Sequence, residues 1–133
     1  MKHIPPVDLT RQYQLIKAEA DSAVLKILNS GRYIGGEAIA TFEQEFANYL
    51  GVRECVSCNS GTDALFLALR ALNIGSTDEV ITTPFSFFAT AEVITRVGAK
   101  PVFVDIDPDT FNFDLAQIEQ AITPQTKAIM PVH

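Results

Sequence analysis

The segment Asn59-Ser60-Gly61-Thr62-Asp63-Ala64-Leu65 decides the fold, because it joins two apolar segments with different periods. Before it, Glu54–Cys58 is a short apolar run typical of a strand, and after it Ala64–Leu72 has helical spacing. A strand that turns tightly into a helix leaves backbone N–H groups unpaired at the first helical turn, where the helix dipole adds partial positive charge. This turn therefore suits a phosphate or another anion.

The same turn also has the residues of an ordinary helix cap. Ser60 as the N-cap residue, with Asp63 three positions later, forms a weak capping box. Gly61 has no side chain to hold an anion away from the backbone, and the hydroxyl groups of Ser60 and Thr62 can donate hydrogen bonds to one. From this segment alone, the cap and the anion site both remain open.

Two helices are predicted upstream of the turn. Residues 8–29 and about 37–50 each carry an apolar stripe at helical spacing. Between them, Gly31-Arg32-Tyr33-Ile34-Gly35-Gly36 is a glycine loop that carries an aromatic residue. It lacks the Gly-Lys-Ser/Thr ending of a Walker loop, and it does not follow a strand as a Rossmann fingerprint does. As a bare pattern it is typical of a flexible connector.

Downstream, apolar runs typical of strands alternate with helical segments. The strands are expected at 54–58, 80–83, 101–105 and 128–132, and the helices at 61–73, from about 88, and at about 114–122. This alternation predicts an α/β fold with a mostly parallel sheet, right-handed crossovers and flanking helices. The predicted organisation is a helical segment at about 8–50 followed by an α/β part at about 54–133. Because the last strand has no following helix to cover it, we expect a truncated piece of a longer protein.

Composition narrows the class of protein. The 133 residues suffice for one domain, and the net charge of −6 argues against a nucleic-acid-binding surface. No apolar run approaches the ~18 residues of a membrane span, and the first residues do not form a signal peptide. The 2 cysteines fit a reducing compartment, so a cytoplasmic protein is expected.

Three phenylalanines follow the second predicted strand, in Thr83-Pro84-Phe85-Ser86-Phe87-Phe88. Ligands of open parallel sheets bind outside the carboxyl ends of the strands, which is where this loop is expected. One or two of these rings are expected in the core, and the third can offer a flat face to an aromatic ring. A phosphate turn with a neighbouring aromatic platform suggests a ligand that is itself a phosphorylated aromatic.

A metal site is not predicted. Asp105-Ile106-Asp107-Pro108-Asp109 begins like a calcium loop, but Thr110 stands where glycine is needed and Ala116 where the bidentate glutamate belongs. Asp109 and Thr110 are therefore interpreted as turn residues, and Asp114 as the start of a helix-capping box.

The pair Cys55-Val56-Ser57-Cys58 has the spacing of a redox motif or half of a zinc site. However, Cys55 falls inside the predicted strand, the spacer lacks Gly-Pro character, and only His3 and His133 remain as further ligands. Buried free thiols are the favoured interpretation.

Several motifs together resemble a known family. They occur in one order over nearly the whole chain: Gly31–Ile34 with Phe42-Glu43, Asn59–Leu65, Thr83–Thr90, Phe103–Asp107 with Thr110 and Asp114, and Met130–His133. The chain resembles the N-terminal part of the DegT-type nucleotide-sugar aminotransferases. These are fold-type I enzymes that use pyridoxal 5'-phosphate, so the resemblance implies the large domain of such an enzyme.

The resemblance also implies roles for individual residues. Ser60, Gly61 and Thr62 would hold the cofactor phosphate, and Phe87 would stack on the pyridine ring. The loop with Tyr33 and Ile34 would lie near the substrate mouth and reach the site of the partner subunit in a homodimer. The implied reaction transfers an amino group from an amino acid donor to a keto-sugar nucleotide, as in polysaccharide biosynthesis.

No catalytic residue is assigned within the chain. The resemblance implies that the Schiff-base lysine follows residue 133, and Lys100 and Lys127 are expected at the amino ends of their strands, opposite the ligand edge. Two alternatives therefore stay open: a non-catalytic regulatory or sensor relative of the same fold, and an inert fragment. A generic nucleotide-binding domain is disfavoured because no Gly-x-Gly-x-x-Gly follows the first strand.

Overall fold

A computed structural model describes residues 5–133, which form two compact units. The first unit ends at Ser57 and the second begins at Cys58. Within residues 5–133, no helix has both the length and the apolar character needed to cross a membrane.

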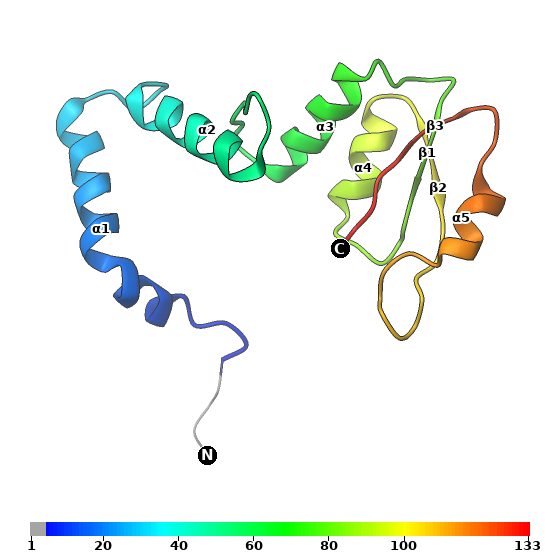
Figure 1. Cartoon of the computed structure of the whole chain (residues 1–133), viewed down its shortest axis with the longest axis horizontal. Coiled ribbons are helices and arrows are strands. Elements are labelled where there is room, and N and C mark those ends of the chain that lie inside the picture. The colour runs from blue at the N-terminus through cyan, green and yellow to red at the C-terminus, as the bar shows by residue number, and fades with distance from the viewer. Residues whose placement is uncertain (1–4) are drawn as a thin grey trace. The chain divides into compact units, whose positions relative to one another are not determined.

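The first unit contains two helices, α1 (Leu9–Ser30) and α2 (Glu37–Leu50), close to the predicted ranges (Figure 1). The carboxylate of Asp8 caps α1 by accepting a 2.9 Å hydrogen bond from the N–H of Arg11. Both helices end at a glycine in the left-handed region, Gly31 at φ 66° and Gly51 at φ 68°, where a residue without Cβ is least strained. Local capping chemistry therefore sets these boundaries.

The apolar stripes of these two helices are largely exposed within the described residues. Along α1, Leu15, Ile16 and Val24 are all exposed, and on α2 the only buried residue is Ala47. Phe42 and Phe46 stack on each other along α2 with ring centroids 5.5 Å apart.

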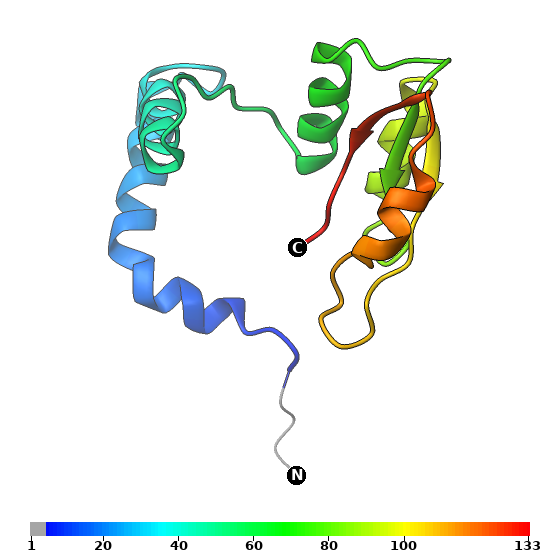
Figure 2. The ribbon, with the colours of Figure 1, turned by 45° about the vertical axis from the view of Figure 1, so that its right-hand side comes forward.

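The second unit is an α/β arrangement around a small sheet. Its elements are α3 (Gly61–Ala71), β1 (Glu79–Thr82), α4 (Ala89–Arg96), β2 (Lys100–Phe103), α5 (Leu115–Ala121) and β3 (Thr126–Ile129). The strand order is β2-β1-β3, and both pairings are parallel. Figures 1 and 2 show α4 and α5 on opposite faces of this sheet. The predicted parallel α/β fold is confirmed.

The core of the second unit lies between the sheet and the helices α3 and α4. It joins Leu69 of α3, Val80 of β1 and Val93 with Ile94 of α4, all at most 3 % exposed. β-branched residues suit a strand covered on its faces, and this explains the buried Val-Ile-Thr run of β1.

One predicted strand does not form. Residues 54–58 have no strand structure, so the sheet has three strands rather than four. A strand needs a neighbouring backbone to take its N–H and C=O groups. In this segment the N–H of Ser57 instead donates to the side chain of Glu43, at 2.7 Å.

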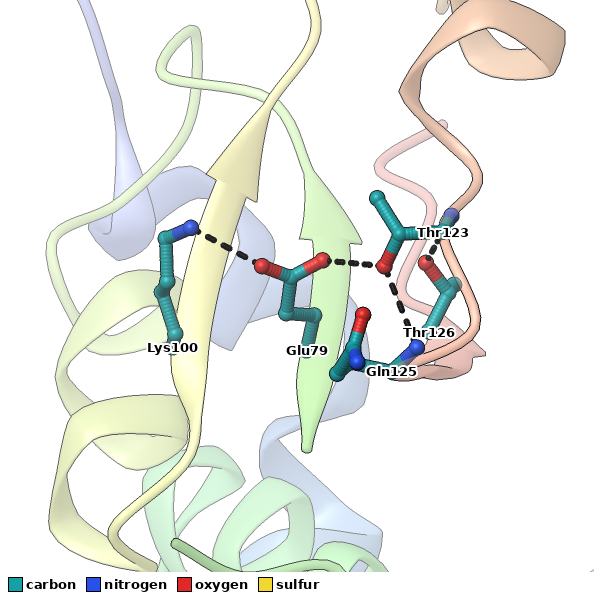
Figure 3. Close-up of polar contacts among 5 residues, drawn as sticks. All are labelled: Glu79, Lys100, Thr123, Gln125 and Thr126. Atoms are coloured by element: carbon teal, nitrogen blue, oxygen red, sulfur yellow. Dashed lines mark hydrogen bonds and ion pairs between the residues drawn. The ribbon is translucent and has the colours of Figure 1, made fainter. Parts of the chain in front are cut away.

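A polar network joins the amino ends of the three strands (Figure 3). Glu79, whose side chain is 13 % exposed, accepts hydrogen bonds from Lys100 Nζ at 2.8 Å and from Thr123 Oγ1 at 2.7 Å. The Lys100 ammonium first, and the Thr123 hydroxyl second, hold the pKa of Glu79 below its ordinary value. Thr123 and Thr126 also close the turn before β3, through a 2.9 Å bond from the N–H of Thr123 to Thr126 Oγ1.

Candidate functional site

The turn before α3 is a capped helix start. Ser60 is extended, at φ −156° and ψ 157°, and its Oγ accepts a 3.1 Å hydrogen bond from the N–H of Asp63. The predicted cap is therefore confirmed. Among residues 5–133, no group accepts a hydrogen bond from the N–H of Gly61 or of Thr62. Two backbone donors thus remain at the positive end of the helix dipole.

The cap does not exclude an anion at the same turn. Ser60 uses a lone pair for capping, so its hydroxyl hydrogen is still available to donate. A Cβ added at Gly61 would meet nothing within 4 Å, so the space over this backbone is open. Backbone donors, hydroxyl groups and an open approach are what a phosphate group requires. The residues present therefore fit a phosphate.

One charge at this turn opposes an anion. Asp63 lies in the first turn of α3, and its Oδ1 is 4.0 Å from Nη1 of Arg96 at the end of α4. The Arg96 guanidinium also lies over the ring of Phe66, 4.5 Å from its centroid. Arg96 thus offsets part of the negative charge of Asp63. Sequence reasoning missed Arg96, because no local spacing signals a contact across 33 positions.

The loop between β1 and α4 places its phenylalanines at the carboxyl end of β1. Phe85, Phe87 and Phe88 are all exposed, and Phe87 is 80 % exposed. The expectation that one or two of them lie in the core is wrong for the described residues. After the loop, the buried side chains are Ala89, Thr90, Val93 and Ile94 of α4, and none of the three loop phenylalanines belongs to the core cluster.

Hydrogen bonds fix this loop at both ends. Near β1, the buried Thr83 accepts a 3.2 Å hydrogen bond from the N–H of Phe85. Near α4, the hydroxyl groups of Ser86 and the buried Thr90 lie 2.7 Å apart. Phe87 lies within the segment that the Ser86–Thr90 contact closes, and its carbonyl accepts a 3.0 Å hydrogen bond from the N–H of Thr90, so its exposed ring is carried by a fixed backbone.

The acidic segment after β2 is a turn, as predicted. The Oδ1 of Asp107 accepts hydrogen bonds from the N–H of Thr110 at 2.9 Å, from its hydroxyl at 3.1 Å and from the N–H of Asp109 at 3.1 Å. These bonds, led by those from Thr110, hold the pKa of Asp107 below its ordinary value. Asp114 caps α5 and accepts from Gln117 Nε2 at 2.7 Å. Over residues 5–133, no three His, Cys, Asp or Glu side chains gather where they could hold a metal ion.

The two cysteines are free, but they are not both buried. Cys55 is half-buried and Cys58 is exposed, so the expectation of two buried thiols is wrong for Cys58. Its Sγ lies 3.3 Å from the carbonyl oxygen of Ser60, which makes it a weak donor to the capping residue. The segment forms no strand that would bury this side chain.

The remaining candidate residues lie in the first unit. Tyr33 and Ile34 are exposed, Ile34 at 96 %, and the Tyr33 hydroxyl donates to the carbonyl of Leu28 at 3.3 Å. In the second unit, Ser60, Gly61 and Thr62 begin α3, and Phe87 precedes α4, which packs against α3.

Lys100 and Lys127 occupy the positions expected for them. Lys100 is the first residue of β2 and Lys127 the second residue of β3, so both lie at the amino ends of their strands. Lys17 and Lys26 lie on α1. Within the second unit, neither lysine is therefore at the carboxyl edge of the sheet, where the phenylalanine loop lies.

A parallel α/β unit in which a helix starts with open backbone donors is typical of proteins that bind phosphorylated small molecules. Sequence comparison gives the family. The chain belongs to the DegT/DnrJ/EryC1/StrS aminotransferase family, which matches residues 14–133.

Individual relatives agree with this assignment. The chain is 48% identical over 131 residues to the "Pleiotropic regulatory protein" of Geobacillus stearothermophilus, covering 98% of this chain and 35% of the relative. It is 47% identical over 126 residues to the UDP-2-acetamido-2-deoxy-3-oxo-D-glucuronate aminotransferase of Pseudomonas aeruginosa, covering 95% of this chain and 35% of the relative. The chain thus spans about a third of the length of these curated relatives.

Solved structures share the fold. The crystal structure of S. venezuelae DesV in complex with a ketimine intermediate matches with a TM-score of 0.95 and 42% identity, over 100% of this chain and 36% of that one. The crystal structure of NtdA from Bacillus subtilis with bound cofactor PMP matches with a TM-score of 0.92 and 35% identity, over 100% of this chain and 31% of that one.

Proposed function

We propose that this chain is the amino-terminal part of a pyridoxal 5'-phosphate-dependent aminotransferase that moves an amino group from an amino acid donor to a keto-sugar nucleotide. The family supports the aminotransferase activity, and the name of the P. aeruginosa relative supports the sugar nucleotide. The observation that carries the proposal is the start of α3. There the N–H groups of Gly61 and Thr62 donate to no acceptor among the described residues, and the approach over Gly61 is open.

Four residues of the second unit would hold the cofactor. The backbone N–H groups of Gly61 and Thr62 and the hydroxyl groups of Ser60 and Thr62 would bind its phosphate, where the helix dipole favours negative charge. The exposed Phe87 would give its face to the ring. When bound, pyridoxal phosphate supplies an electron sink for negative charge formed at the substrate carbon. The residues of this chain would bind and orient it.

The first unit would serve the substrate. Tyr33 and Ile34, exposed on the glycine loop, would contact the sugar nucleotide and reach the site of the partner in a homodimer. Because the described lysines lie on α1 or at amino ends of strands, the lysine that carries the cofactor would be supplied by residues after 133. The chain alone would then be inactive. We also expect a cytoplasmic location.

A regulatory relative without catalysis is the second candidate, and one observation favours it: the G. stearothermophilus relative is named a pleiotropic regulatory protein. The two candidates differ in chemistry, since only the enzyme needs a lysine that can bond the cofactor covalently.

The test uses the full-length protein. It is incubated with pyridoxal phosphate, dialysed, and examined for a visible absorption band that borohydride fixes to one lysine. Amino transfer is then assayed with an amino acid donor and a keto-sugar nucleotide. A fixed band and transfer support the enzyme. Reversible binding without fixation favours the regulatory protein, and no binding at all refutes the cofactor site.

A further inference from the structure

The loop after β2 holds one residue in a backbone conformation that its side chain disfavours. Phe111 has φ 60°, in the left-handed region that bulky side chains rarely adopt. The surrounding bonds enforce it: the N–H of Phe111 donates to the carbonyl of Asp107 at 2.9 Å, and the N–H of Asp107 donates to the carbonyl of Asn112 at 2.8 Å. The Asp107 carboxylate also accepts three hydrogen bonds, one from Asp109 and two from Thr110, which hold the same turn.

This conformation places the Phe111 ring against the phenylalanine loop. Phe111 stacks on Phe85 with ring centroids 5.8 Å apart and an interplanar angle of 26°. Offset stacking of this kind is a favourable aromatic arrangement. Phe85 is two residues before Phe87, in the loop that Thr83, Ser86 and Thr90 anchor by hydrogen bonds. The stack is thus a third anchor of that loop, and it comes from a different part of the chain.

The anchors of the loop differ in what they fix. The bond at Thr83 holds the backbone N–H of Phe85, and the bond at Thr90 holds the side chain of Ser86. The Phe85–Phe111 stack instead holds the ring of Phe85, two residues before the exposed Phe87. Phe87 itself takes part in none of the aromatic pairs among the described residues. Its orientation therefore depends on how firmly the neighbouring backbone is held.

We propose that Phe111 is a positioning residue for the cofactor: by stacking on Phe85, it holds the loop so that Phe87 presents its face to the cofactor ring. This role rests on the proposed function, because it requires that Phe87 meets a ring. Phe111 acts through Phe85 and does not itself touch the cofactor. The strained backbone conformation of Phe111 then contributes to this positioning role, because it directs the Phe111 ring toward the loop.

The test compares three substitutions at position 111 in the full-length protein. Phe111→Ala removes the ring and keeps a residue that resists positive φ, whereas Phe111→Gly removes the ring and relieves the backbone. Phe111→Tyr keeps the stack. Affinity for pyridoxal phosphate, measured by fluorescence titration, should fall about two- to tenfold for both Ala and Gly and stay within about twofold for Tyr. Leu115→Ala, an exposed apolar residue near this loop, is the control and should leave the affinity unchanged.

A double-mutant cycle separates positioning from general stability. Phe87→Ala/Phe111→Ala should bind the cofactor no more weakly than Phe87→Ala, because Phe111 acts only through Phe87. The visible circular dichroism of the bound cofactor at saturation should also weaken in Phe111→Gly and be restored in Phe111→Tyr. Additive losses, or an unchanged affinity and dichroism in Phe111→Gly, overturn the positioning role. If Phe87→Ala itself binds the cofactor normally, the ring contact in the proposed function fails as well.

Discussion

The carboxylate of Glu43 holds Ser57 by both of its polar groups: Oε1 accepts from the Ser57 N–H at 2.7 Å and from its hydroxyl at 2.8 Å. The two residues are 14 positions apart and both partly buried. This contact ties the irregular segment 52–57 to α2 within the first unit. The backbone bond from Ser57 first, and its hydroxyl second, hold the pKa of Glu43 below its ordinary value.

This contact predicts how the stability of the folded state depends on pH. A carboxylate with a lowered pKa in the folded state contributes stability that is fully present above its unfolded pKa and is lost as the pH falls through the folded one. We therefore expect Glu43→Gln to lower the melting temperature at pH 7. Below about pH 4.5, the melting temperature of this variant should fall less steeply with decreasing pH than that of the parent protein. Thermal unfolding followed from pH 3 to pH 8 measures both. Glu45→Gln, on the same helix but without a hydrogen bond or ion pair within residues 5–133, is the control. If the melting temperature of Glu43→Gln fell in acid as steeply as that of the parent protein, this account would be contradicted.

The network at the amino ends of the strands gives a second pH prediction. Lys100→Met removes the largest cause of the lowered pKa of Glu79. Since Lys100 is mostly exposed, stability at pH 7 should change little. The pKa of Glu79 should move back toward its ordinary value, so the onset of acid unfolding should move to higher pH. Acid titration followed by circular dichroism tests this, with Lys127→Met on β3 as the matched control. If acid unfolding began at the same pH in the two variants, the ion pair between Lys100 and Glu79 would have no effect on acid stability.

The sequence predicted those parts of the fold that local chemistry sets. The caps at Ser60 and Asp114 and the turn at Asp107 depend on side chains within a few residues, so their patterns could be read directly. The strands near 80, 101 and 128 were recognisable as β-branched apolar runs between helices. These features were enough to predict a parallel α/β arrangement.

What could not be predicted depends on contacts between distant residues. Residues 54–58 have the composition of a strand, but a strand exists only where a neighbour takes its hydrogen bonds. Likewise, no local pattern distinguishes a buried phenylalanine from an exposed one, and Phe85 finds its partner in Phe111, 26 positions away. The pair Asp63–Arg96 is of the same kind. The capped helix start at Ser60 was therefore predictable, whereas the distant partners of Asp63 and Phe85 were not.

The phosphate turn yields a third prediction, made for the full-length protein. Gly61→Val should strongly weaken the binding of pyridoxal phosphate, because a side chain would fill the open space over the backbone donors. Thr62→Ala should weaken binding less, since it removes one hydrogen bond to a charged group, worth roughly 1.5–3 kcal/mol. Titration with the cofactor and with inorganic phosphate measures both effects, and Thr77→Val, an exposed threonine away from the turn, serves as the control. If Gly61→Val binds like the parent protein, the turn is a helix cap and nothing more.

The last prediction concerns the aromatic platform. Phe87→Ala should weaken cofactor binding by roughly 0.5–1.5 kcal/mol beyond the lost burial, because it removes the ring that would stack on the cofactor. Phe88→Ala deletes an equally exposed ring one position further along the same loop and is the matched control. Its cofactor affinity should stay close to that of the parent protein. Since inorganic phosphate has no ring, its binding should be the same in both variants, and this separates the platform from the phosphate turn. Equal losses of cofactor affinity in the two variants would mean that the loop as a whole matters, rather than the face of Phe87.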